Sequence, residues 1–125
     1  MGQVRVRGIR GAITASENHS NAIYQSTEEL VRRMVEVNSV EPEDVAAAFF
    51  TVTPDLNDAF PARAVREMGW VQVPLFCSVE IDVPGALAKC IRVLLLVNTN
   101  LAQEEIKHSY LREASKLRSD LQKDT

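Results

Sequence analysis

The segment Ile91–Val97 constrains the fold of this chain more than any other. It is continuously apolar except for one arginine, Arg92. A short apolar run of this kind is typical of a strand in the middle of a sheet. Because the guanidinium of Arg92 cannot lose its proton to escape burial, it must reach solvent, pair with an acid or meet an anionic ligand. Glu80 and Asp82 are the candidate acidic partners.

Strands and helices are expected to alternate in the first half of the chain. Val4, Val6 and Ile9 indicate a strand, which we expect Gly8 and Gly11 to break. Apolar residues then recur at helical spacing, which predicts a helix that begins with Ser20 as its N-cap and ends near Asn38. The apolar segment 45–52 favours a buried strand, although its three consecutive alanines would also suit a helix.

The second half continues the alternation. A short helix is predicted over 62–68 and a short strand over 71–74, followed by a segment of mixed polarity over 77–83. Pro84-Gly85 indicates a turn before a helical patch over 86–90. From Gln103 onward the apolar spacing suits either a helix or a helical turn followed by a strand. The sequence therefore predicts one α+β domain over residues 1–125, with a mixed sheet flanked by helices.

Charge and motif content exclude several function classes. The chain has 14 basic and 17 acidic side chains, a net charge of −3, which argues against nucleic-acid binding. It has no apolar run long enough for a membrane span. We find no CxxC, HExxH, GxSxG or GxGxxG motif, so we expect no metal and no cofactor. Without an apolar signal segment at the start, we expect a cytoplasmic protein whose Cys77 and Cys90 are free thiols.

Arginine outnumbers lysine by 10 to 4. The planar guanidinium is the side chain best suited to bidentate recognition of carboxylate or phosphate. Taken alone, most of these arginines are expected to be solvated surface residues. Arg92 is expected to be a strand residue that pairs with an acid or reaches solvent.

Several segments, read together, resemble one family. In chain order they are RGIRGA at 7–12, TPDL at 53–56, AFPARAVR at 59–66, CIRV at 90–93, and His108, Tyr110-Leu111 and Leu117-Arg118. Their order and spacing, from about residue 4 to residue 121, resemble the monofunctional trimeric chorismate mutases of the pseudo-α/β-barrel (AroH) class. The resemblance also favours a helical turn over 103–107 and a strand through Tyr110.

The resemblance implies an isomerase of phenylalanine and tyrosine biosynthesis that converts chorismate to prephenate. This Claisen rearrangement needs no nucleophile, metal or proton transfer. By the same resemblance Arg92 stabilises the breaking ether oxygen, Arg10 binds a substrate carboxylate, Tyr110 adds a hydroxyl donor and Glu80 binds the ring hydroxyl. Cys77 would line the pocket without acting as a thiolate. The other substrate-binding residues implied are Phe60, Ala62, Arg63, Arg66, Leu75, Phe76, Ser78, Val79, Leu117 and Arg118.

The family assembles as a homotrimer, so the pocket is expected to be shared between subunits. The segment from Phe60 to Arg66 would come from the neighbour, and a flexible tail over 115–125 would partly cover the pocket. Phe76, Ala102 and Ser119 depart from the family pattern. Two alternatives remain open at this stage: an enamine/imine deaminase of related architecture, and a non-catalytic anion-binding regulatory trimer.

Overall fold

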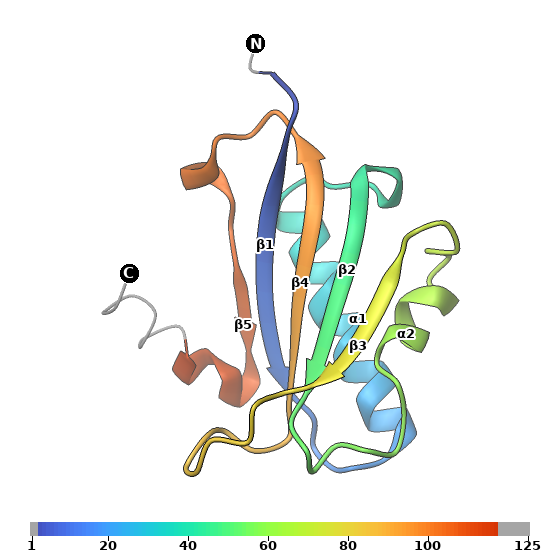
Figure 1. Ribbon diagram of the computed structural model, residues 1–125, viewed down its shortest axis with the longest axis vertical. Coiled ribbons are helices and arrows are strands. Elements are labelled where there is room, and N and C mark those ends of the chain that lie inside the picture. The colour runs from blue at the N-terminus through green and yellow to red at the C-terminus, as the bar shows by residue number, and fades with distance from the viewer. Residues whose placement is uncertain (1–2, 118–125) are drawn as a thin grey trace.

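A computed structural model describes residues 3–117 of the chain. They form one mixed five-stranded sheet with two helices on one of its faces (Figure 1). The strands are β1 (Arg5–Thr14), β2 (Val45–Val52), β3 (Leu75–Val79), β4 (Cys90–Thr99) and β5 (Ser109–Leu111), and the helices are α1 (Ser20–Val37) and α2 (Ala62–Glu67). The α+β expectation is confirmed.

The strand order is β3-β2-β4-β1-β5. The central strand β4 is antiparallel to both β1 and β2, while the edge strands β3 and β5 are parallel to β2 and β1. The run Ile91–Val97 therefore lies in the middle of the sheet, as predicted. Strand β2 also forms as predicted, because pairing with β4 and β3 overrides the helical preference of its alanines.

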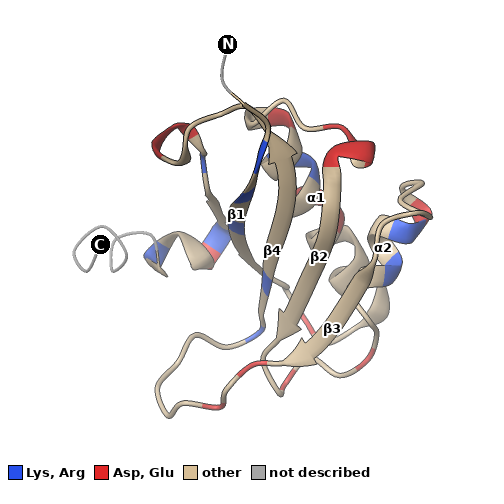
Figure 2. Ribbon diagram, turned by 45° about the horizontal axis from the view of Figure 1, so that its top comes forward, with Lys and Arg blue, Asp and Glu red and all other residues tan. Residues whose placement is uncertain are grey.

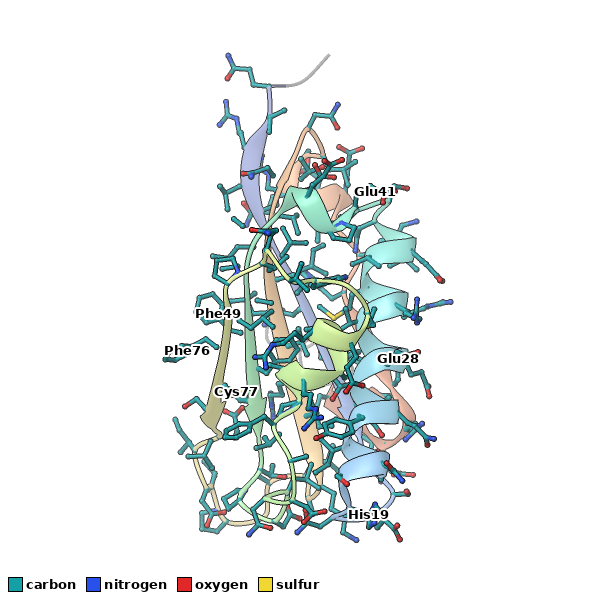
Figure 3. The ribbon with its side chains drawn as sticks, turned by 90° about the vertical axis from the view of Figure 1, so that its right-hand side faces the viewer. His19, Glu28, Glu41, Phe49, Phe76 and Cys77 are labelled. Atoms are coloured by element: carbon teal, nitrogen blue, oxygen red, sulfur yellow. The ribbon has the colours of Figure 1, made fainter. Side chains whose placement is uncertain are left out.

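In the part of the chain that the structure describes, α1 and α2 cover one face of the sheet. Helix α1 packs against β1 and β5, and α2 packs against β3. Viewed edge-on, both helices lie on the same side, while Phe49 and Phe76 project from the opposite side (Figure 3). We call this second side the open face. The main core lies between the sheet and α1, around the fully buried Ile13, Leu30, Phe50 and Leu95.

The start of the chain corrects two expectations. Strand β1 continues through Gly8 and Gly11 instead of breaking there. Gly11 faces α1, where a Cβ would press against Met34 and Leu30, so this glycine allows close packing. The N-cap of α1 is His19 and not Ser20, since His19 Nδ1 accepts from the Asn21 N–H at 3.2 Å.

Two short elements were predicted wrongly. There is no strand over 71–74: β3 begins at Leu75, after Pro74, which has no N–H to donate to a ladder and contributes only its carbonyl, to Ala48. There is no helix over 86–90 either. That segment closes a loop in which Lys89 has a φ of 51° and donates its N–H to Asp55, a geometry incompatible with a continuing helix.

The last described segment follows the family expectation. A 3-10 turn at Gln103–Glu105 leads to strand β5. The N–H of Ala102 donates to Glu105 Oε1 at 2.7 Å. A proline at this position would have no N–H for that bond, so the departure at Ala102 has a local role.

Candidate functional site

Three predicted site residues gather on the open face of the sheet. Arg92 on β4 pairs with Ala12 on β1 and with Thr51 on β2, and Tyr110 on β5 also pairs with Ala12. Arg10 precedes Ala12 by two residues, so its side chain leaves the sheet on the same face. Figure 2 shows that basic residues lie along β1 and β4, while β2 and β3 carry no charge.

These side chains surround a cavity of about 370 Å³. Its lining is Arg10, Gly11, Ala12, Phe49, Thr51, Arg92, Val93, Leu94, Tyr110 and Leu117. Two guanidinium groups and one phenol therefore converge within walls that are otherwise almost entirely apolar. The two guanidinium groups favour an anionic ligand, and the apolar walls favour one with an apolar body. The few convergent polar groups would fix its orientation.

The Nε of Arg92 lies beside an acidic side chain but makes no hydrogen bond to it. Arg92 Nε lies 3.5 Å from Glu80 Oε2, close enough for an ion pair. That buried Nε has no hydrogen-bond partner within residues 3–117. Glu80 Oε2 accepts instead from the Thr51 hydroxyl at 2.6 Å. The expected pairing of Arg92 with Glu80 is thus present, as an ion pair without a hydrogen bond.

The two arginines also act on their titratable neighbours. Burial raises the pKa of Tyr110, and the charges of Arg10 and Arg92 counteract this only partly. The phenol therefore remains a hydrogen-bond donor at neutral pH. Burial, with the nearby charge of Arg10, lowers the pKa of His108. Its neutral ring accepts from the Arg10 N–H at Nδ1, at 2.9 Å, and fixes the backbone where β5 joins β1.

A second group of predicted residues lies apart from this cavity. Cys77, Phe60 and Arg63 line a separate cavity of about 580 Å³, beside the edge strand β3. Cys77 pairs with the buried Phe50 and so points to the helix side, whereas Phe76 pairs with Phe49 on the open face. Within one chain the predicted site is therefore divided into two clusters.

The thiol of Cys77 has the electrostatics of a structural cysteine. Burial raises its pKa, and the Ala62 backbone and the charge of Arg66 offset the effect only partly. It is therefore a neutral thiol at pH 7. Both Cys77 and Cys90 are free, as expected.

The remaining predicted residues have different surroundings. Leu75 packs against the core, while Phe76 is 64% exposed and meets Phe49 edge-to-face at 6.2 Å between ring centroids. Ser78 and Val79 are exposed at the sheet edge. Ala62 is buried at the start of α2, whereas Arg66 is exposed in its last turn. Arg118, Ser119 and the tail beyond them lie outside the described residues.

Sequence reasoning missed Thr51, Phe49 and Leu94, all on the open face. The one available signal was the two-residue alternation along β2 and β4, which places Phe49 and Thr51 on one face with Leu94 and Arg92 on the same face. That signal depends on the pairing of β2 with β4, which the sequence alone does not reveal.

A family model described as chorismate mutase type I matches residues 6–121. The chain belongs to the type I chorismate mutase family. Chorismate mutase AroH of Thermus thermophilus is 52% identical over 118 residues, which are 94% of this chain and 97% of that protein. Chorismate mutase AroH of Bacillus subtilis is 46% identical over 117 residues, or 93% and 92% of the two chains. A solved chorismate mutase structure from Clostridium thermocellum has a TM-score of 0.86 at 49% identity and covers 87% of this chain and 97% of its own.

These similarities confirm the expected family, its fold and its enzyme class for this type I chorismate mutase. Neither the deaminase nor the regulatory alternative finds support. Residues 3–117 contain no group of three or more His, Cys, Asp or Glu side chains arranged to hold a metal ion. Among the helices that the structure describes, none is long and apolar enough to cross a membrane.

Proposed function

We propose that this enzyme rearranges chorismate to prephenate in the open-face cavity. Within one molecule the ether C–O bond breaks while a C–C bond forms, so no atom is gained or lost. No proton transfer is required. The protein has two tasks: to hold a dianion in its compact reactive shape and to stabilise the charge that develops on the ether oxygen.

The observation that carries this proposal is the convergence of Arg92, Arg10 and Tyr110 on one cavity whose walls are otherwise almost entirely apolar. Arg92 is the cation beside the ether oxygen, and its geometry is set in advance by Glu80. Arg10 binds a carboxylate, and Tyr110 donates its hydroxyl. Glu80 is not in the lining of this cavity but lines a neighbouring one that Arg92 also borders, and from there it would bind the ring hydroxyl. A fixed cation at developing negative charge acts on the transition state more than on the ground state.

The test is a direct assay of purified protein with chorismate. Loss of the ultraviolet absorbance of chorismate and appearance of prephenate, both well above the uncatalysed rate, would support the proposal. Absence of prephenate above that rate would refute it. A protein that binds chorismate without turning it over would instead be the regulatory form.

The second cluster supports a pocket shared between copies of the chain. Phe60 is 75% exposed and lies with Arg63 beside Cys77, outside the cavity of Arg92. On the open face, Val6, Phe76 and Leu94 expose apolar surface that no described element covers. Packing of these faces around a three-fold axis would bury them and bring Phe60, Ala62, Arg63 and Arg66 of one subunit towards Arg92 of the next.

Light scattering coupled to size exclusion tests this assembly. We expect a homotrimer of the 13.9 kDa chain at concentrations where it is active. An active monomer would contradict the shared pocket.

We also propose a cytoplasmic location, which the free thiols of Cys77 and Cys90 support because a reducing compartment keeps thiols unpaired.

Replacing Thr51 with valine is expected to lower kcat/KM about fivefold to twentyfold. The change keeps the shape but removes the hydroxyl that holds Glu80, whose carboxylate then turns more fully to Arg92 and competes with the ligand. Steady-state assays of the purified variant measure the loss. Thr51→Ser is the matched control, since it retains the hydroxyl and is expected to stay within about threefold of the parent. Equal losses in both variants would contradict this role, because Thr51→Ser keeps the hydroxyl and should then keep most of the activity.

Replacing Cys77 with alanine is expected to lower activity only a few-fold. The raised pKa of this thiol keeps it neutral up to and beyond pH 8, and the backbone amide survives the substitution. The profile of kcat against pH between 6 and 8 should therefore be the same in parent and variant. A collapse of activity, or the loss of a pH-dependent limb in the variant, would reveal thiol chemistry.

A further inference from the structure

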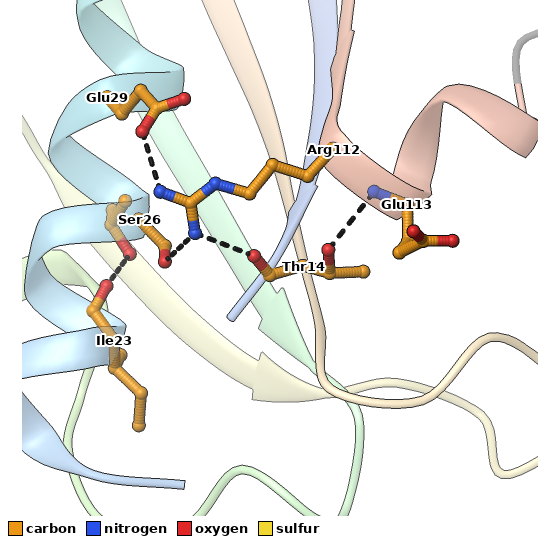
Figure 4. Close-up of polar contacts among 7 residues, drawn as sticks. Thr14, Ile23, Ser26, Glu29, Arg112 and Glu113 are labelled. Atoms are coloured by element: carbon orange, nitrogen blue, oxygen red, sulfur yellow. Dashed lines mark hydrogen bonds and ion pairs between the residues drawn. The ribbon is translucent and has the colours of Figure 1, made fainter. Parts of the chain in front are cut away.

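Arg112 makes a set of contacts that the proposed reaction does not use. Its Nη1 donates to the Thr14 carbonyl at 3.1 Å and to the Ser26 hydroxyl at 3.0 Å, and its Nη2 meets Glu29 Oε1 at 2.7 Å (Figure 4). One side chain thus joins the end of β1 to the flank of α1. Ser26 is almost fully buried, so this clamp reaches the edge of the core.

The backbone at the same residue is also unusual. Arg112 has a φ of 54°, a left-handed conformation that is costly for a residue with a side chain. The next N–H, of Glu113, donates to the Thr14 hydroxyl at 3.3 Å. Thr14 therefore receives hydrogen bonds from two consecutive residues, and together they hold the sharp change of direction where β5 ends.

This change of direction sets the position of one wall of the cavity, the segment 110–117. Tyr110 precedes Arg112 by two residues, Leu117 follows it by five, and both line the cavity with Arg92. Between them Ala114 is fully buried, against Ala12 and Cys90.

The clamp adds to two other restraints on this wall, the pairing of β5 with β1 and the packing of Ala114. Strand β5 has three residues and, among residues 3–117, pairs with β1 alone, at the edge of the sheet. A three-residue edge pairing is a weak anchor by itself. The side chain of Arg112 hydrogen-bonds the segment 109–117 to two residues of α1, Ser26 and Glu29.

We propose that Arg112 is a positioning residue that sets Tyr110 and Leu117 against the substrate. The proposal rests on the function proposed above for the cavity. Arg112 touches no reacting atom; it acts by fixing where the C-terminal wall leaves the sheet. Since that wall contacts substrate in ground state and transition state alike, loosening it weakens binding more than it slows the chemical step.

The test compares Arg112→Gly with Arg112→Lys. Glycine adopts the left-handed φ without cost, so the first variant removes the clamp but keeps the backbone allowed. We expect its KM for chorismate to rise about tenfold with kcat changed less than about threefold. Lysine retains the charge for Glu29 but not the fork that reaches Thr14 and Ser26 together, so its KM should be intermediate. A variant that is only partly unfolded would lose apparent kcat with an unchanged KM, and that result would overturn the proposal.

Arg32→Ala is the matched control, because Arg32 makes a single exposed ion pair with Glu28 on α1, at 3.1 Å, far from the cavity lining. Its kinetic constants should equal those of the parent. Hydrogen exchange of the free protein supplies a readout independent of turnover. In Arg112→Gly the amides of 109–117 should exchange about tenfold faster, with those of β4 unchanged. Unchanged exchange over 109–117 would overturn the clamp, whereas a parent enzyme without turnover would overturn only the proposed function.

Discussion

Replacing Arg92 with alanine is expected to lower kcat/KM for chorismate at least about a hundredfold. Removing one preorganised donor from a site of developing charge raises the activation barrier by on the order of 3 kcal/mol. We propose that Arg92 is the donor that stabilises the charge developing on the ether oxygen. The loss should fall mainly on kcat, because the charge appears only as the ether bond breaks. Steady-state assays of the purified variant measure it.

The fold should survive this substitution, so a loss of activity can be assigned to the missing guanidinium and not to unfolding. The Arg92 side chain is 43% exposed, and the strand around it is held by buried neighbours such as Ile91 and Val93. Circular dichroism and light scattering check that folding and assembly are intact. Arg92→Lys restores a cation but not the guanidinium fork, so it should recover only part of the rate. A folded Arg92→Ala variant within tenfold of the parent would remove Arg92 from the mechanism.

The fold could be predicted where local pattern and tertiary burial agree. Helix α1 and strands β2 and β4 each follow an apolar pattern that the core then uses. Prediction failed where a distant contact decides local structure. Gly11 does not break β1, because α1 packs against it, and the segment 86–90 is not helical, because Asp55 holds Lys89 in a loop. Neither partner is visible in the local sequence.

The candidate site was predictable in a different way. Arg92 drew attention from the sequence alone, as a charge inside an apolar strand. Arg10 and Tyr110 came from family resemblance, since nothing in their local pattern separates them from surface residues. What joins them is the pairing of β1 with both β4 and β5, a long-range property. Thr51 and Arg112 carried no family motif, and only their hydrogen bonds single them out.

Replacing Gly11 with alanine is expected to destabilise the protein by about 1–3 kcal/mol, the usual cost of an overpacked core. A Cβ at this position would overlap Met34 Sδ, and it would lie 3.0 Å from Leu30 Cδ1. Both side chains are fully buried, so neither can move aside into solvent. Urea denaturation at one fixed protein concentration measures the change in the free energy of unfolding.

Gly8→Ala is the matched control on the same strand. A Cβ there meets only Leu94 Cδ1, at an ordinary 3.5 Å, so stability should stay the same or rise by up to about 1 kcal/mol as the strand loses a flexible glycine. Met34→Ala completes a double-mutant cycle: with Met34 shortened, the added methyl group at Gly11 has room, and its cost should shrink. If Gly11→Ala cost the same in both backgrounds, crowding against α1 would not be the cause. Because Gly11 lies beside Arg10 in the cavity lining, the same crowding links the packing of α1 to the placement of Arg10, which we propose binds a substrate carboxylate.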